Sequence, residues 1–247
     1  MVRDAGYRKA KYNRKRKTSM PVAYKEAMED AKITPKEIDA TLLCSAPEYD
    51  KQRTPAGLIA EYLGLNPQPA FYVESVCSSS STGLRIAYSL IKSGLHDTVI
   101  VLGLQKMSEI TSAESQERMG RGADIMWEAP FGTMMPAYYA MYARGHMNKY
   151  GTTEEQLMAV SIKNHANGAL NPKAHMQNTI REIMKKRIER AKKKGESIPN
   201  WADEYEFLKS NANPMIAYPL RLFDCSLITD GAACLFLAAE EVARRFT

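Results

Sequence analysis

The stretch AFYVESVCSSSSTGLRIAYSLIKSGLHDTVIVLGL, residues 70–104, decides the fold class of this sequence. It opens with a β-branched and aromatic run that predicts a strand ending just before Cys77. A helix is predicted next, closed by a glycine cap at Gly94 and followed by the apolar strand DTVIVLGL. The apolar residues expected to share one face of this helix are Leu84, Ala87, Tyr88 and Ile91. The stretch therefore predicts a strand, a helix and a second strand in direct succession.

The residues before this stretch show the same alternation. SMPVAYKEAMEDAKITPKEI predicts a helix that begins at Ser19 and stops near Pro35. DATLLCSA predicts a buried strand, and TPAGLIAEYLGL predicts a helix from Pro55 to Gly64. Helices and strands in regular alternation are typical of an α/β sheet covered by helices. In such folds functional groups gather where strands end and helices begin.

Cys77 lies at one of these strand-to-helix turns. Free backbone N–H groups and the positive end of the helix dipole at such a turn can stabilise a thiolate or hold an oxyanion. Free cysteines are also common core residues, so position alone leaves a nucleophile and a packing residue open. The serines from Ser78 to Ser81 leave room for a substrate beside the sulfur, but serines also commonly cap helices.

The composition indicates a folded protein with free thiols. The chain has 247 residues, 45% hydrophobic and 25% charged, which is enough for one large or two small domains. No run approaches the roughly 18 apolar residues of a membrane span, and the basic N-terminus lacks the apolar core of a signal peptide. We therefore expect a cytoplasmic protein without membrane contact. Four scattered cysteines without a CxxC pair argue against a metal site or disulfides.

The net charge of +6 is concentrated in two basic segments. Residues 3–17 hold eight Lys or Arg and one Asp, and residues 181–194 hold eight Lys or Arg and two Glu. Such segments are either solvated surface or attraction sites for an anionic partner. No aromatic residue interleaves with REIMKKRIERAKKKGE, so we expect no nucleic-acid partner.

Three stretches together resemble the thiolase superfamily: VESVCSSSSTGLRIAYSLIKSG, KNHANGALNPKAHMQ and PLRLFDCSLITDGAACLFLAAEEVA. The similarity is strongest to sterol-carrier-protein-type thiolases and acetyl-CoA acetyltransferases, and it runs from about residue 20 to the end. It implies the first, N-terminal half of the thiolase fold, a mixed β-sheet covered by helices. The implied boundaries are residues 1–103 and 223–247 for this half and residues 104–222 for an inserted loop domain over the active site.

The resemblance also implies a chemistry. Cys77 matches the cysteine with which the family attacks an acyl-CoA thioester to form an acyl-enzyme. A second acyl-CoA then condenses with the acyl group, or in reverse a 3-ketoacyl-CoA is cleaved by CoA. The implied substrates are acyl-CoA and CoA, and no separate cofactor is expected.

The sequence departs from the family in its second half. The family's base lies in a C-terminal half, in a Gly-His-Pro motif, and this sequence contains no such motif. A truncation, a split enzyme and a subunit without catalysis all remain open, and we favour the split enzyme. We then expect a homodimerising half, paired across its sheet edge, inside a hetero-oligomer that contains the C-terminal half. Some relatives also work beside a small OB-fold, zinc-ribbon protein. The alternative is a non-catalytic scaffold that binds acyl-CoA.

Candidate substrate contacts beyond Cys77 are its neighbour Ser78 and three residues of the expected loop domain. His165 lies in a family-like motif, which places it near the active site in a structural or substrate-contacting role. A hydrogen-bonded histidine in a turn shaped by neighbouring asparagines is the alternative. Met126 and Met134 belong to an apolar region that could accept an acyl chain, although core packing is the simpler explanation.

The segment 182–207 is longer than the resemblance leads us to expect. It predicts a basic helix, a turn from Gly195 to Pro199 and a short helix near Trp201. Trp201 either lies exposed on a docking surface or folds back onto the domain.

Overall fold

The computed structural model describes residues 19–46, 54–132 and 134–246. The basic segment at residues 3–17 lies outside these ranges. The chain divides into two compact units. Unit 1 contains the described residues up to Ser115 and those from Ile228 onward, and unit 2 contains Gln116–Leu227. The predicted domain boundaries after residues 103 and 222 stay a prediction.

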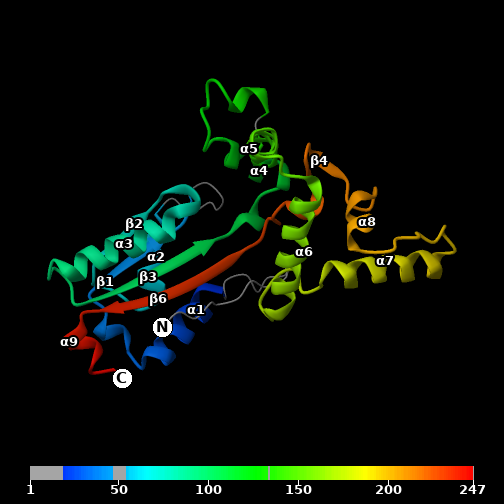
Figure 1. Ribbon diagram of the computed structural model, residues 1–247. Helices are drawn as coiled ribbons and strands as arrows, with labels where there is room; N and C mark the ends of the chain where they lie inside the picture. Colours follow the sequence, from blue (N-terminus) through cyan, green and yellow to red (C-terminus); the bar gives the residue numbers. More distant parts are fainter. Residues whose placement is uncertain (1–18, 47–53, 133, 247) are drawn as a thin grey trace. The chain divides into compact units, whose positions relative to one another are not determined.

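A four-stranded sheet forms the centre of unit 1 (Figure 1). Its strands, in order across the sheet, are β2 (Ala70–Val73), β1 (Ala40–Cys44), β3 (Thr98–Gln105) and β6 (Gly231–Ala238). β1 pairs with β2 and with β3 in parallel, whereas β6 runs antiparallel to β3. This confirms the predicted mixed sheet.

Helices cover both faces of this sheet. α1 (Ser19–Ala31) and α2 (Pro55–Tyr62) contribute to one buried cluster, together with Leu43, Ile100 and Leu102 of the strands. α3 (Ser79–Lys92) lies along the opposite face (Figure 1). Its cluster takes the alternate strand residues Leu42, Cys44, Val99 and Val101. Successive strand residues point to opposite faces, so these continuous apolar strands supply two cores at once.

The buried face of α3 differs from the predicted one. Ala87 is buried as expected, but Leu84 and Tyr88 are 41% and 61% exposed. The residues that pack on the sheet with Ala87 are Ile86, Leu90 and Ile91. The helix is rotated because Gly83, with no side chain, faces β1 and permits a close approach.

Unit 2 is mostly helical. Its helices are α5 (Met135–Tyr150), α6 (Glu154–Leu170), α7 (Ile180–Lys194) and α8 (Glu204–Lys209), and α4 (Ser112–Gly120) spans the boundary with unit 1. A small hairpin of β4 (Met215–Ala217) and β5 (Leu220–Arg221) follows, and α9 (Glu240–Ala243) ends unit 1. The 3₁₀ turns are η2 (Pro35–Glu37), η3 (Val76–Ser78), η4 (Met107–Glu109), η5 (Ala129–Phe131) and η6 (Leu222–Asp224). No helix in the described ranges is both long and apolar enough to cross a membrane.

Side chains cap the helix starts in unit 2. Thr153 and Gln156 form a capping box at the start of α6: the Gln156 N–H donates to the Thr153 hydroxyl, and the Thr153 N–H donates to the Gln156 side chain. The predicted basic helix is α7, which ends at Gly195 in a left-handed conformation.

Candidate active site

The turn between β2 and α3 positions Cys77. The strand ends at Val73, the short helix η3 follows, and α3 begins at Ser79 (Figure 1). Cys77 is the central residue of η3 and is exposed. The thiol therefore lies at the carboxyl end of a parallel strand and at the start of a 14-residue helix, where backbone N–H groups point outward. An exposed side chain does not fill the core of this chain, which argues against the packing alternative.

Carboxylate and hydroxyl groups hold this turn from within. The Val76 N–H donates to the Glu74 carboxylate at 2.6 Å. The Ser79 hydroxyl donates to the Val76 carbonyl at 2.7 Å and accepts from the Ser75 N–H at 2.9 Å. The Ser78 hydroxyl donates to the Ser75 carbonyl at 2.7 Å. Both peptide groups that flank Val76 are thus fixed by side chains of the turn itself.

Ser78 does not cap α3, although it occupies the N-cap position. Its hydroxyl is directed back to Ser75 instead of toward the first turn of α3, so the capping expected from the serine run is wrong at this residue. Ser79, the next serine, is buried. A contact between Ser78 and a substrate stays a prediction.

Val76 has a left-handed backbone conformation, with φ at 48°. A β-branched residue rarely adopts this conformation, which costs about 1–3 kcal/mol. This conformation could not be predicted from the sequence, because glycine or asparagine usually occupies such a position. The strained residue directly precedes Cys77.

Sequence reasoning also missed a polar network at the ends of the neighbouring strands. The Gln105 side chain, at the end of β3, accepts from the Ala46 N–H at 3.0 Å. The Tyr72 hydroxyl, on β2, donates to the Ser45 carbonyl just beyond β1 at 3.0 Å. These residues gather at the carboxyl edge of the parallel strands, where sites of α/β sheets form. That rule, applied to each predicted strand end, would have found them.

The other three cysteines are in different surroundings from Cys77. Burial raises the pKa of the Cys44 thiol to about 11 and that of Cys234 to about 12. The pKa of Cys225, which is half-buried, is raised by burial and then by the Asp224 carboxylate. No group of three or more potential ligand side chains that could hold a metal ion occurs in the described parts of the chain.

Iodoacetamide should label Cys77 before the other thiols. At pH 8 a thiol with a pKa of about 11 or 12 is ionised in about one molecule in a thousand or fewer, and only the thiolate reacts. We expect one rapid adduct per chain, mapped to Cys77 by peptide mass spectrometry, and labelling of Cys44 and Cys234 only after unfolding. Equal rates at Cys44 and Cys77 in the folded protein would contradict this order.

His165 lies inside a helix and not in a turn. α6 continues to Leu170, so the alternative of a turn is wrong at this residue, and the helix ends at the cap residue Asn171. The asparagines here do not break the helix because the capping box at its start and its packing in unit 2 outweigh their weak helix preference. His165 is half-buried, and its Nδ1 lies 3.4 Å from the Asn178 carbonyl oxygen.

An aromatic series joins His165 to the segment 182–207. The His165 ring packs edge-on against Phe223, with 5.5 Å between centroids, and Phe223 contacts Phe207. Phe207 is fully buried, and Trp201 packs edge-on against it at 5.0 Å. Trp201 therefore folds back onto unit 2, which settles the alternative left open by the sequence.

Polar contacts brace the same region. The buried Asn213 side chain donates to the Leu208 carbonyl at 2.9 Å and accepts from the Phe223 N–H at 2.9 Å. Arg181 of α7 forms a two-point ion pair with Glu204 of α8, and this contact lowers the pKa of the Glu204 carboxyl. Helices α7 and α8 of the segment 182–207 are thus held in unit 2 by both packing and polar contacts.

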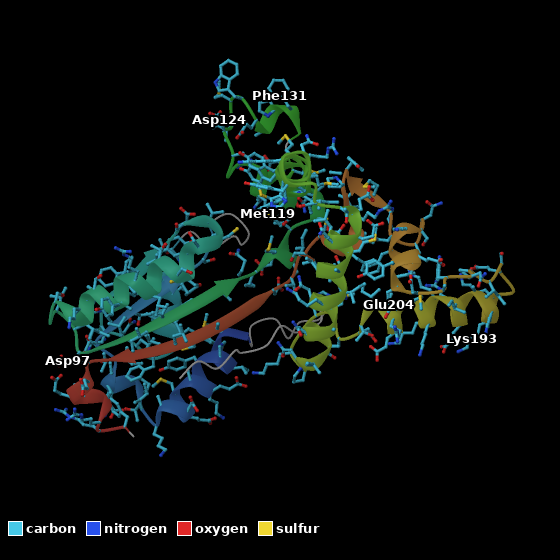
Figure 2. The ribbon with its side chains drawn as sticks, in the orientation of Figure 1. Asp97, Met119, Asp124, Phe131, Lys193 and Glu204 are labelled. Atoms are coloured by element: carbon cyan, nitrogen blue, oxygen red, sulfur yellow. The ribbon has the colours of Figure 1, made fainter. Side chains whose placement is uncertain are left out.

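Met126 and Met134 are exposed, at 72% and 47%. Met126 lies on a turn in which the Asp124 carboxylate accepts from the Met126 and Trp127 N–H groups. Phe131, on the 3₁₀ turn η5 that follows, is exposed as well (Figure 2). Core packing was therefore the wrong explanation for these residues, and an acyl-chain contact stays a prediction.

The predicted site residues fall into two groups. Cys77 and Ser78 share one turn of unit 1. His165, Met126 and Met134 belong to unit 2, on α6, on the turn after α4 and at the N-cap of α5. Their assignment to a common site stays a prediction.

Comparisons with known proteins define the family. The family model described as "Thiolase, N-terminal domain" matches residues 13–241, so this chain belongs to the thiolase family. It is 36% identical over 225 residues to the acetyl-CoA acetyltransferase of Methanothermobacter thermautotrophicus, covering 90% of this chain and 51% of that protein. The resemblance expected from the sequence is confirmed.

Solved structures agree on the fold. The Ltp2-ChsH2(DUF35) aldolase matches 90% of this chain and 50% of its own, at a TM-score of 0.63 and 22% identity. The Acat5 thiolase from Ascaris suum in complex with coenzyme A matches 91% of this chain and 60% of its own, at a TM-score of 0.57 and 20% identity. The thiolase fold is thereby confirmed, and the chain spans about half the length of the curated relatives it matches.

Proposed function

We propose that this chain carries the nucleophile of a thiolase-type acyl-CoA acyltransferase, and that Cys77 is that nucleophile. The exposed thiol at the start of α3 supports the proposal, together with the family membership of the chain. The thiolate sulfur attacks the thioester carbon of acyl-CoA and forms a tetrahedral intermediate. The bond to the CoA sulfur then breaks, the acyl group stays on Cys77, and the CoA thiolate leaves and takes a proton from water.

Backbone geometry suits this step. The negative oxygen of the tetrahedral intermediate needs donors that are already oriented, and the start of a helix supplies N–H groups of this kind. Transfer of the acyl group from CoA to the cysteine replaces one thioester with another, so its free-energy change is close to zero. The step can therefore run in both directions. Condensation starts from this acyl-enzyme, whereas thiolysis forms it by cleavage of a 3-ketoacyl-CoA and then transfers the acyl group to CoA.

Carbon–carbon bond chemistry requires a second set of residues. A base must remove a proton from the α-carbon of the second acyl-CoA, and donors must hold the resulting enolate. The family resemblance assigns these groups to a C-terminal half with a Gly-His-Pro motif, which residues 1–247 do not contain. We propose that they come from outside this sequence, on a separate or on a longer polypeptide.

The test is formation of an acetyl thioester on Cys77. The protein is incubated with acetyl-CoA, and the adduct is located by peptide mass spectrometry and released by neutral hydroxylamine, which cleaves thioesters and spares acetyl-lysine. Acetyl-CoA should also protect Cys77 from iodoacetamide. Protection without an adduct would favour the alternative, a non-catalytic subunit that binds acyl-CoA. If acetyl-CoA neither protects Cys77 nor forms an adduct with it, both the acyltransferase and the acyl-CoA-binding subunit are refuted.

We also propose that the chain dimerises across the β2 edge of its sheet. β2 pairs with β1, and within the described chain its other edge carries no strand. Phe71 and Tyr72 on this strand are 43% and 38% exposed. An exposed apolar strand at the edge of a sheet favours pairing with a second strand. A small OB-fold, zinc-ribbon companion stays a prediction from the family resemblance.

Substituting Phe71→Lys should convert the dimer to a monomer. A charged side chain on an edge strand opposes strand addition, because the ammonium group must be desolvated in the new interface. Sedimentation velocity measures the change, and Tyr62→Lys, on the exposed surface of α2, is the matched control that should remain dimeric. A wild-type monomer, or a Phe71→Lys dimer, would refute pairing at this edge.

A further inference from the structure

The strained residue before Cys77 requires something to hold it. Val76 has φ at 48°, a conformation that is strained for a β-branched residue. Strain of this kind persists only where the surroundings fix the backbone. The contacts of the Val76 peptide groups identify what fixes it here.

Two side chains hold Val76, one on each side. On the N-terminal side the Glu74 carboxylate accepts the Val76 N–H at 2.6 Å. On the C-terminal side the Ser79 hydroxyl donates to the Val76 carbonyl at 2.7 Å. Ser79 is buried and also binds the Ser75 N–H, so it is part of the framework of the turn. Glu74 is exposed, and its carboxylate is held in the turn by the hydrogen bond from the Val76 N–H.

The orientation of Cys77 follows from Val76. If Val76 relaxed to an extended conformation, the peptide plane between Val76 and Cys77 would rotate and move the thiol relative to the N–H groups at the start of α3. A hydrogen bond from the Val76 N–H to a side-chain oxygen opposes this relaxation, since the free energy of such a bond is comparable to the smaller costs of such strain.

We propose that Glu74 is a positioning residue for Cys77, acting through the left-handed conformation of Val76. The carboxylate selects that conformation, and the conformation places the thiol. Glu74 itself exchanges no proton and touches no reacting atom. The inference deepens the proposed function, and rests on it for the acyl-transfer measurement.

Paired substitutions of Glu74 separate hydrogen bonding from charge. Glu74→Gln keeps a side-chain oxygen that can accept the Val76 N–H, whereas Glu74→Ala removes it. Rates of adduct formation with acetyl-CoA and with iodoacetamide at Cys77 are measured for each, with Glu61→Ala on α2 as an exposed control. We expect Glu74→Gln and Glu61→Ala to stay close to wild type, and Glu74→Ala to lose about tenfold in acetyl transfer, as small misplacements of reacting groups do.

A second pair of variants tests the route through Val76. Glycine adopts positive φ without strain, so in a Val76→Gly background the turn no longer needs the carboxylate to reach this conformation. The tenfold loss caused by Glu74→Ala should then shrink to a small factor. This coupling is a signature that general destabilisation would not produce, and thermal unfolding of each variant identifies any that fails to fold.

Three outcomes would overturn the inference. Glu74→Ala could react like wild type, Glu74→Gln could be as impaired as Glu74→Ala, or the loss could be equal in the Val76→Gly background. If wild-type protein forms no acetyl adduct, the proposed function fails, and the iodoacetamide rates still decide the role of Glu74.

Discussion

Replacing Cys77 with serine should abolish the acetyl adduct and lower acyl transfer at least about a thousandfold, as removal of a covalent nucleophile does. A serine hydroxyl at this position is almost entirely protonated near neutral pH, and in that form it is a weak nucleophile. The exposed side chain makes no buried contact, so the free energy of unfolding should change by less than about 0.5 kcal/mol. Loss of activity and retention of stability should therefore occur together.

Cys225→Ser is the matched control for this prediction. It is the same chemical change at a half-buried thiol whose pKa is raised by burial. Acetyl transfer, measured by mass spectrometry after a short incubation with acetyl-CoA, should be close to wild type in this variant. An acetyl thioester that persists in Cys77→Ser would assign the nucleophile to another cysteine.

Local sequence signals predicted the layout of unit 1 well. Each of its strands is a short apolar run between turn residues, and α2 begins at Pro55 and is followed by Gly64, as these residues favour. Strand-like and helix-like hydrophobic patterns alternate along the sequence and are separated by turn residues such as proline and glycine. This alternation therefore identified the order β1–α2–β2–α3–β3. Register and strand order needed the structure, because a fully buried strand shows no preferred face in its sequence.

The details of the candidate site were not predictable in the same way. Position relative to the strand and helix made Cys77 a candidate, and the family resemblance gave it the role of nucleophile. The left-handed conformation of Val76 and its contact with Glu74 could not be predicted, because no residue type in VESVC indicates a positive φ. A turn at His165 was one of two alternatives, suggested by the asparagines around it, and the packing of α6 overrode that preference. Propensity is a weak prior wherever tertiary contacts are strong.

Gly83→Ala should destabilise unit 1 by about 2–3 kcal/mol, as overpacking of a filled core does. A Cβ at Gly83 would lie 2.2 Å from the Cys44 sulfur and 3.5 Å from a methyl group of Val101. Cys44 is buried on β1, so its sulfur has little room to rotate away. The overlap must push α3 from the sheet. Urea unfolding followed by circular dichroism measures the loss.

Gly57→Ala is the internal control, since it makes the same change in a helix where nothing lies within 4 Å of the new methyl group. It should gain up to about 1 kcal/mol from the better helix preference of alanine. A stability of Gly83→Ala equal to that of Gly57→Ala would show that the contact between α3 and β1 is loose.

A double substitution tests whether the overlap with sulfur is the cause. Cys44→Ala removes the atom that a Cβ at Gly83 would meet, so Cys44→Ala with Gly83→Ala should be more stable than Gly83→Ala alone.

The same variants should also change the rate of acetyl transfer at the candidate site. α3 starts two residues after Cys77, and a helix displaced from β1 carries the Cys77 turn with it. Gly83→Ala should therefore also slow acetyl transfer at Cys77, and removal of the Cys44 sulfur should restore part of that rate. Restored stability without restored transfer would mean that the Glu74–Ser79 turn places the thiol independently of α3.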